Sequence, residues 1–139
     1  MNTNKKNILW VDDDVNRMAL LPDRDALEEK GYNIIAIDRV DDFLHFIKED
    51  SRRIDCIILD IHMATGDLNS IETQNGTRTG IPLYNIIQKT PKYKNTIIVI
   101  YSVFKKEDLG KIGEEDKIVF LLKDLKSSEF ANTISNLVG

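Results

Sequence analysis

"ILWVDDDV" (residues 8–15) places three consecutive aspartates directly after four apolar residues. The apolar run is typical of a short, fully buried strand, so the carboxylates begin where such a strand would reach the surface. One interpretation is helix capping, because aspartate is favoured just before and within the first turn of a helix. The stretch alone does not choose between capping and a chemical role for Asp12, Asp13 and Asp14. That choice depends on the architecture of the rest of the chain.

Four further runs are short, rich in Ile or Val and nearly continuously apolar. Together the predicted strands cover residues 7–11, 32–37, 54–59, 96–101 and 118–122. Continuous rather than alternating apolar runs indicate strands that are covered on both faces. Amphipathic segments lie between them; Asp41, Pro82 and Ser127 mark helix starts, and Gly31 marks the end of the first helix. Five strands alternating with five helices predict an α/β protein with a doubly wound parallel sheet.

The composition is that of an ordinary globular domain. The chain has 139 residues, of which 42% are hydrophobic and 30% charged, and a formal net charge of -4; this fits a single domain spanning residues 1–139. The acidic balance argues against direct binding to nucleic acid or to an anionic membrane. Cys56 is the only cysteine, the polar N-terminus has no apolar signal region, and no run approaches membrane-spanning length. We therefore expect a cytoplasmic protein that does not bind membranes.

Polar residues follow four of the predicted strands. The acidic cluster follows the first strand, Asp60 follows the third, Ser102 the fourth and Lys123 the fifth. Each residue by itself has an ordinary explanation as a loop acid, a turn residue or a solvated charge. In an open parallel sheet, however, the site lies at the carboxyl ends of the strands, where the strand order reverses. The joint placement of these residues therefore predicts one site at this edge.

Four motifs, "VDDD", "IILDIHM", "VIYS" and "FLLKD", occur in this order at compatible spacings. Together they resemble the receiver domains of two-component response regulators. The resemblance runs from about residue 8 to residue 137 and implies a flavodoxin-like (βα)5 fold with strand order 2-1-3-4-5. It implies that Asp60 is the phospho-accepting aspartate and that Asp12 and Asp13 form the acidic pair that holds a divalent cation. Ser102 would be the hydroxyl that follows the phosphoryl group, and Lys123 the lysine that pairs with it.

The resemblance implies Mg²⁺ as cofactor. A carboxylate is a weak nucleophile toward phosphorus because both partners carry negative charge, and Mg²⁺ removes this obstacle by binding oxygens of both. We expect direct coordination by Asp13, Asp60 and the backbone carbonyl of His62, with Asp12 acting through water. Asp14 is left as a helix-capping residue.

The implied function is phosphorelay signal transduction by a stand-alone receiver, which is not an enzyme in the usual sense. A sensor histidine kinase or a histidine-phosphotransfer protein would donate the phosphoryl group to Asp60, assisted by Ser102 and Lys123. Phe120 occupies the position of the switch aromatic. Ser102 and Phe120 would change the face built from the fourth helix, the fifth strand and the fifth helix, which would bind a downstream protein partner.

Three residues depart from the family pattern. Asp124 follows Lys123, where the family usually has proline after a cis bond; a non-proline cis bond costs about 3–4 kcal/mol, so we expect a trans bond. Val103 is bulkier than the small residue usual after the hydroxyl position, and it would narrow access to Asp60. Pro22 interrupts the apolar pattern of the first helix, which predicts a kink or a restart there.

The largest departure is an insertion at about residues 64–79, between the third strand and the third helix. Gly80 opens the helix twenty residues after Asp60, and loops of this length are uncommon in compact domains. Two interpretations remain open: a solvated insertion without a role, or a lid or partner-recognition element beside the site.

Two alternative functions compete with phosphotransfer. "DIHMATG" (residues 60–66) resembles the signature of cobalamin-binding domains with His62 as the cobalt ligand, but this leaves the acidic cluster and Lys123 without a role. The stronger alternative is a phosphorylation-deficient, receiver-like module for protein interaction, which Val103, Asp124 and the insertion favour.

Overall fold

The computed structural model describes residues 5–61, 80–103, 105, 107 and 117–139. The described strands are β1 (Asn7–Val11), β2 (Asn33–Ile37), β3 (Cys56–Leu59), β4 (Ile97–Ser102) and β5 (Ile118–Leu122). The helices are α1 (Leu21–Glu29), α2 (Val40–Glu49), α4 (Gly80–Gln88), the short 3-10 helix η1 (Pro91–Tyr93) and α5 (Ser127–Val138). His62, the insertion at residues 64–79 and most of the predicted fourth helix lie outside the described residues.

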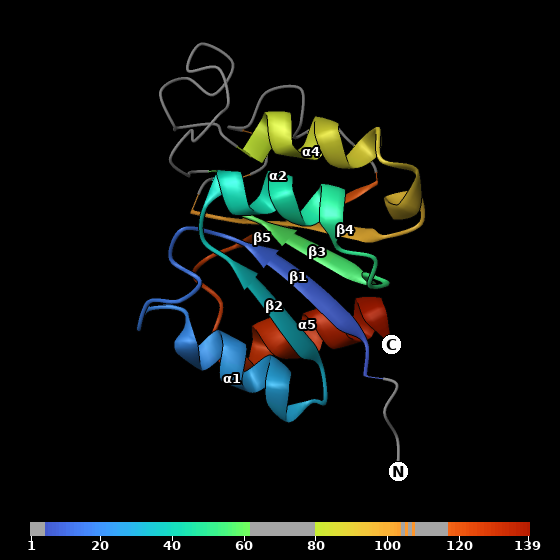
Figure 1. Ribbon diagram of the computed structural model, residues 1–139. Coiled ribbons are helices and arrows are strands. Elements are labelled where there is room, and N and C mark those ends of the chain that lie inside the picture. Colours follow the sequence, from blue (N-terminus) through green and yellow to red (C-terminus); the bar gives the residue numbers. More distant parts are fainter. Residues whose placement is uncertain (1–4, 62–79, 104, 106, 108–116) are drawn as a thin grey trace.

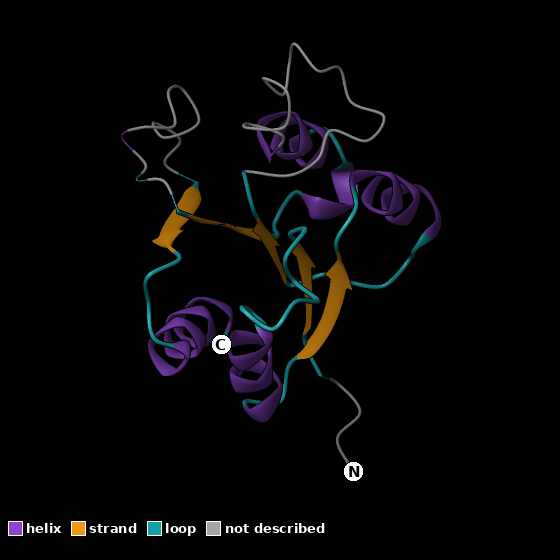
Figure 2. Cartoon of the chain, turned by 90° about the vertical axis from the view of Figure 1, so that its left-hand side faces the viewer, coloured by secondary structure: helices purple, strands orange, loops and turns teal. Residues whose placement is uncertain are grey.

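The five strands form one parallel sheet in the order β2-β1-β3-β4-β5. Helices α2 and α4 cover one face of the sheet and α1 and α5 cover the other (Figure 1). The sheet therefore lies between two helical layers, as the turned view shows (Figure 2). The predicted flavodoxin-like, doubly wound fold is confirmed.

Successive side chains of each strand point to opposite faces of the sheet and supply two separate cores. The core under α2 and α4 includes Leu9, Phe43, Ile57, Leu83 and Ile100. The core under α1 and α5 includes Trp10, Leu27, Ile58, Tyr101 and Phe130. Burial on both faces explains why the strand sequences are continuously apolar.

The chain between β1 and α1 forms turns, not a helix. Helix α1 begins at Leu21 with Pro22 in its first turn, where proline is favoured because its missing N–H has no helical partner to lose. The predicted restart at Pro22 is therefore the true start of the helix. The prediction that Asp14 caps a helix is wrong. Its backbone N–H donates to Asp12 Oδ1 at 2.9 Å and its carboxylate pairs with Arg17 at 3.2 Å, so local turn contacts hold it instead.

Other helix boundaries agree with the sequence signals. Asp41 lies in the first turn of α2 and Ser127 is the first residue of α5. Gly31 follows α1 with φ of 95°, a left-handed conformation that glycine adopts without a Cβ clash. Across the described part of the chain, no helix combines the length and the apolar character needed to span a membrane.

Candidate functional site

The carboxyl ends of β1 and β3 lie side by side at one edge of the sheet. Val11 pairs with Leu59 in register, and the Asp60 N–H donates to the Val11 carbonyl at 2.9 Å. The Asp12 N–H donates to the Ile37 carbonyl of β2 at 3.0 Å. Asp12 and Asp60 are thus the first residues beyond two neighbouring strands, and ladder hydrogen bonds fix the backbone of both.

Three carboxylates meet at this edge. Asp12, Asp13 and Asp60 each offer an oxygen, and these oxygens lie within 4.8 Å of one another. Asp12 is fully buried, Asp60 is 3% exposed and Asp13 is half-buried. Burial, and then the negative charges of Asp14 and Asp12, raise the pKa of the Asp13 carboxyl. A compact cluster of carboxylate oxygens is the kind of ligand set that a hard divalent cation prefers.

Lys123 brings a positive charge to the cluster from the end of β5. Its Nζ lies 2.8 Å from Asp12 Oδ2 and 3.4 Å from Asp60 Oδ2. Its backbone N–H donates to the Ser102 carbonyl at 2.8 Å and so continues the β4–β5 ladder. Burial alone would lower the pKa of Lys123, but the charges of Asp12 and Asp60 outweigh burial and raise it. The three carboxylates and one ammonium leave a local charge of about -2, which a divalent cation would offset.

Ser102 and Phe120 lie on neighbouring strands beside this cluster. Ser102 is the buried last residue of β4. Phe120 on β5 pairs in register with Ile100 and packs against the core under α2 and α4. A pocket of about 260 Å³ is lined by Ser102, Phe120 and Ile100 among others. The structure therefore places open space next to the predicted switch aromatic.

A buried polar pair beside the site was not expected from the sequence. The Tyr101 hydroxyl donates to Asp23 Oδ2 of α1 at 3.0 Å, and both side chains are buried. The Tyr101 ring stacks on Phe130 of α5 at 4.4 Å between centroids, and the Lys123 Nζ lies 5.9 Å from its centre. Burial, and then the charge of Asp23, raise the pKa of the Tyr101 phenol, which keeps it a donor. The available signal was a tyrosine in a buried strand, because a buried hydroxyl requires a partner.

The structure describes two of the residues that differ from the receiver-domain pattern, Asp124 and Val103, but not the insertion at residues 64–79. The described part of the chain contains no cis peptide bond, so the bond between Lys123 and Asp124 is trans, as expected. Val103 follows Ser102 and is 66% exposed.

Comparisons with known proteins bear on this arrangement. No protein-family model matches the sequence, and no curated protein matches it significantly. Solved structures do match. The chemotaxis response regulator CheY4 of Vibrio cholerae superimposes with a TM-score of 0.70 at 19% identity, covering 96% of this chain and 99% of that one. A response regulator from Thermotoga maritima gives a TM-score of 0.68 at 18% identity, covering 96% and 98%. The chain has the fold of response-regulator receiver domains.

The predicted resemblance to receiver domains is thereby confirmed. A further receiver-fold neighbour, the response regulator TrrA of Thermotoga maritima, was solved in complex with Mg²⁺-BeF. It matches with a TM-score of 0.63 at 25% identity, covering 95% of this chain and 98% of that one. On this receiver fold, the acidic cluster, Ser102 and Lys123 all lie at the carboxyl edge of the sheet.

Proposed function

We propose that the protein is a phosphorelay receiver that accepts a phosphoryl group on Asp60 from a histidine kinase or a histidine-phosphotransfer protein. The groups that surround the Asp60 carboxylate support this proposal. It lies at the carboxyl end of β3, in one cluster with Asp12 and Asp13, and 3.4 Å from the Lys123 ammonium. A nucleophilic carboxylate, an acidic cation site and a fixed ammonium are the groups that aspartyl phosphorylation requires.

The protein groups would act by position and charge. An Asp60 oxygen would form the bond to phosphorus while the P–N bond of the phosphohistidine donor breaks, and the electron pair returns to the imidazole. Lys123 would neutralise charge on a phosphoryl oxygen. Its contact with Asp12 orients the ammonium before a donor binds. The Ser102 hydroxyl, on the neighbouring strand, would donate a hydrogen bond to another phosphoryl oxygen.

The acidic cluster fits Mg²⁺ in charge and in ligand type. One oxygen of Asp12 accepts a backbone N–H and the other faces Lys123. These contacts support Asp13 and Asp60 as direct ligands and Asp12 as a partner through water. The His62 carbonyl stays a predicted third ligand outside the described residues. The bound cation would offset the repulsion between the carboxylate and the incoming phosphoryl group.

Phosphorylation would switch the surface around β5. The modification adds about 1.5–2 negative charges at neutral pH, and Ser102 and Lys123 would shift toward them. The ring of Phe120 would turn toward the pocket that it shares with Ser102. The face formed by β5, α5 and the helix predicted between β4 and β5 would then bind a downstream protein partner.

A matched pair of variants tests the cation site. Mg²⁺ should raise the melting temperature of the protein, because a ligand that binds only the folded state stabilises it by about 2.7 kcal/mol at a hundred times its Kd. Asp13→Ala should abolish this effect. Asp14→Ala should keep it, since Asp14 pairs with Arg17 and lies outside the cluster. Equal Mg²⁺ responses in both variants would contradict the assigned site, and no response in the unmodified protein would favour the phosphorylation-deficient interaction module.

A further inference from the structure

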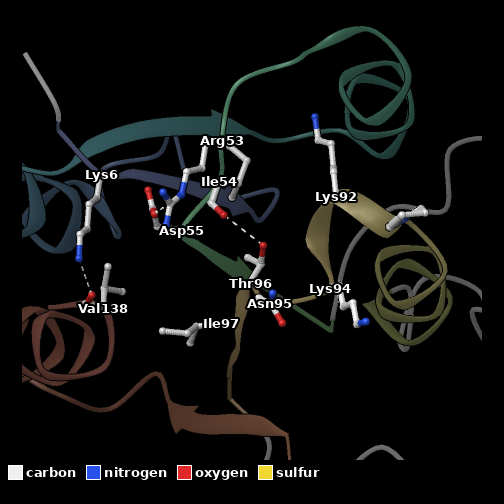
Figure 3. Close-up of a pocket in the computed structure, with 11 residues that line it drawn as sticks. Lys6, Arg53, Ile54, Asp55, Lys92, Lys94, Asn95, Thr96, Ile97 and Val138 are labelled. Atoms are coloured by element: carbon white, nitrogen blue, oxygen red, sulfur yellow. Dashed lines mark hydrogen bonds and ion pairs between the residues drawn. The ribbon is translucent and has the colours of Figure 1, made fainter.

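A second polar hollow lies at the amino edge of the sheet. Its volume is about 470 Å³. It lies where β1, β3 and β4 begin and where α5 ends (Figure 3). Pockets that bind small molecules span roughly 300–1,000 Å³. Asp60 lies beyond the opposite, carboxyl end of β3, so the proposed phosphotransfer makes no use of this hollow.

Cationic side chains gather around the hollow although the chain carries a net charge of -4. Lys6 and Arg53 lie on one side of it, and Lys92 and Lys94 lie on the other (Figure 3). Asp55 is the one acidic residue among the lining residues that the structure describes. The lining therefore has the opposite charge balance to the whole protein, which favours an anionic ligand.

Asp55 offsets only one of the four positive charges of the lining. Its Oδ1 pairs with Arg53 Nε at 3.2 Å, and its Oδ2 accepts the Asn7 N–H at 2.9 Å. Both carboxylate oxygens thus have partners within the protein. After the Arg53–Asp55 pair is counted, the three lysines of the lining remain as excess charge.

Two of these lysines donate to backbone carbonyls, and the Asp50 carboxylate near Lys92 already pairs with Arg52 at 2.8 Å. Lys6 donates to the Val138 carbonyl at 2.8 Å, and Lys92 donates to the Asp50 carbonyl. A carbonyl is a neutral acceptor, and an ammonium has three donors, so both lysines keep their charge and further N–H groups. The ammonium of Lys94 has no hydrogen bond or ion pair within the described ranges, and its side chain is exposed.

The remaining lining suits a ligand that is not purely ionic. Ile97 and Val138 are half-buried and give the hollow apolar surface. The Asn95 amide can donate and accept, and the Thr96 hydroxyl, which donates to the Ile54 carbonyl at 3.1 Å, keeps lone pairs that can accept. A concave site with apolar surface, orienting polar groups and excess positive charge differs from a flat basic patch, which would suit an acidic protein segment.

We propose that this hollow binds a phosphorylated small molecule of nucleotide size. The anionic group would lie nearest Lys94, and Lys6 and Lys92 would add positive charge from the two sides of the hollow. The less polar part would lie on Ile97 and Val138. Such a ligand would act on the amino edge, independently of the metal and phosphoryl chemistry at the carboxyl edge.

An amide-resolved NMR titration of the whole protein tests this proposal. The probe is AMP, added in the presence of EDTA so that no metal bridges it to the acidic cluster. The proposal predicts saturable shifts of the Lys6, Asp55 and Thr96 amides and no comparable shifts at Asp12 or Asp60. Adenosine and inorganic phosphate should each bind at least about tenfold more weakly than AMP, because each offers only part of the recognised chemistry. Equal binding of AMP and inorganic phosphate would overturn the proposal, as would tighter binding of a hexaglutamate peptide at the same amides.

Charge reversal at one exposed lysine provides the matched control. Lys94→Glu should weaken AMP binding by about tenfold or more without changing the melting temperature, because the exposed Lys94 side chain makes no hydrogen bond or ion pair within the described part of the chain. Lys89→Glu makes the same charge change on an exposed residue outside the lining and should leave AMP affinity within about twofold. Equal losses in the two variants would reduce the effect to net charge and overturn the assignment of the site.

Discussion

The Lys123 ammonium lies 2.8 Å from the Asp12 carboxylate, which is fully buried. Taking both charges out of water is unfavourable, and removing one partner leaves the other buried without compensation. The pair therefore fixes the direction of Lys123 at the end of β5. The same ammonium reaches to within 3.4 Å of Asp60, so the lysine is in position before a phosphoryl group arrives.

Replacing Lys123 by methionine should destabilise the protein in the absence of metal. Three carboxylates would then lie together without a cation, and breaking a buried ion pair costs about 3–5 kcal/mol. Mg²⁺ should recover more stability in Lys123→Met than in the unmodified protein. Urea unfolding with and without Mg²⁺ measures both effects, and the exposed Lys126→Met serves as control. An unchanged free energy of unfolding in Lys123→Met would contradict the ion pair.

As the pH is lowered, Mg²⁺ affinity should be lost at a higher pH than it would be if Asp13 had the pKa of an ordinary aspartate. The raised pKa of Asp13 means that this carboxyl gains a proton at a higher pH than usual, and a protonated carboxyl no longer binds the cation. Asp14 contributes to this shift, so Asp14→Asn should move the midpoint of the loss to lower pH. Calorimetric titrations over a pH series measure the midpoint. The same midpoint in both proteins would show that Asp13 does not control binding.

The Tyr101–Asp23 hydrogen bond should couple α1 to β4 energetically. Tyr101→Phe removes the donor from a buried carboxylate, which costs about 1–3 kcal/mol. Combined with Asp23→Ala, the loss should be smaller than the sum of the single losses by about 0.5–3 kcal/mol. Tyr32→Phe, which removes a bond to the neutral Ser135 hydroxyl, is the control and should cost less. Strict additivity in urea unfolding would argue against the pair.

The strands of the sheet could be predicted from the sequence because a strand that is buried on both faces has a continuous run of apolar residues. Every strand, and the positions of Asp60, Ser102 and Lys123 at strand ends, followed from continuous apolar runs and their limits. The start of α1 was harder to predict from the sequence, because aspartate is favoured both in turns and at helix caps. Asp14 was accordingly misassigned, and the proline at position 22 proved the better signal.

Contacts between distant segments left no local pattern. Tyr101 and Asp23 are 78 residues apart, and the core that α1 and β4 share with α5 brings them together. The hollow at the amino edge likewise joins Lys6, Arg53 and Lys94 from separate segments. The hydrophobic periodicity of the sequence can assign such residues to a helix or a strand, but it cannot predict which ends of these elements lie side by side.

Val103 should limit access to Asp60 by small phosphoryl donors. Its branched side chain is 66% exposed directly after Ser102, whereas Asp60 is only 3% exposed. Val103→Ala should therefore react faster with acetyl phosphate and also hydrolyse the product faster. Single-turnover kinetics measures both rates. Equal rates in the two proteins would remove crowding as the explanation.

Mass spectrometry of the intact protein tests whether Asp60 is phosphorylated in a Mg²⁺-dependent reaction. After incubation with acetyl phosphate, or with phosphorylated histidine kinases and phosphotransfer proteins, we expect one phosphoryl adduct that requires Mg²⁺. Peptide mapping should place the adduct on Asp60, and Asp60→Asn should lack it while keeping its fold. Absence of any Mg²⁺-dependent adduct on Asp60 with every donor would contradict phosphotransfer and favour a receiver-like module that only binds other proteins.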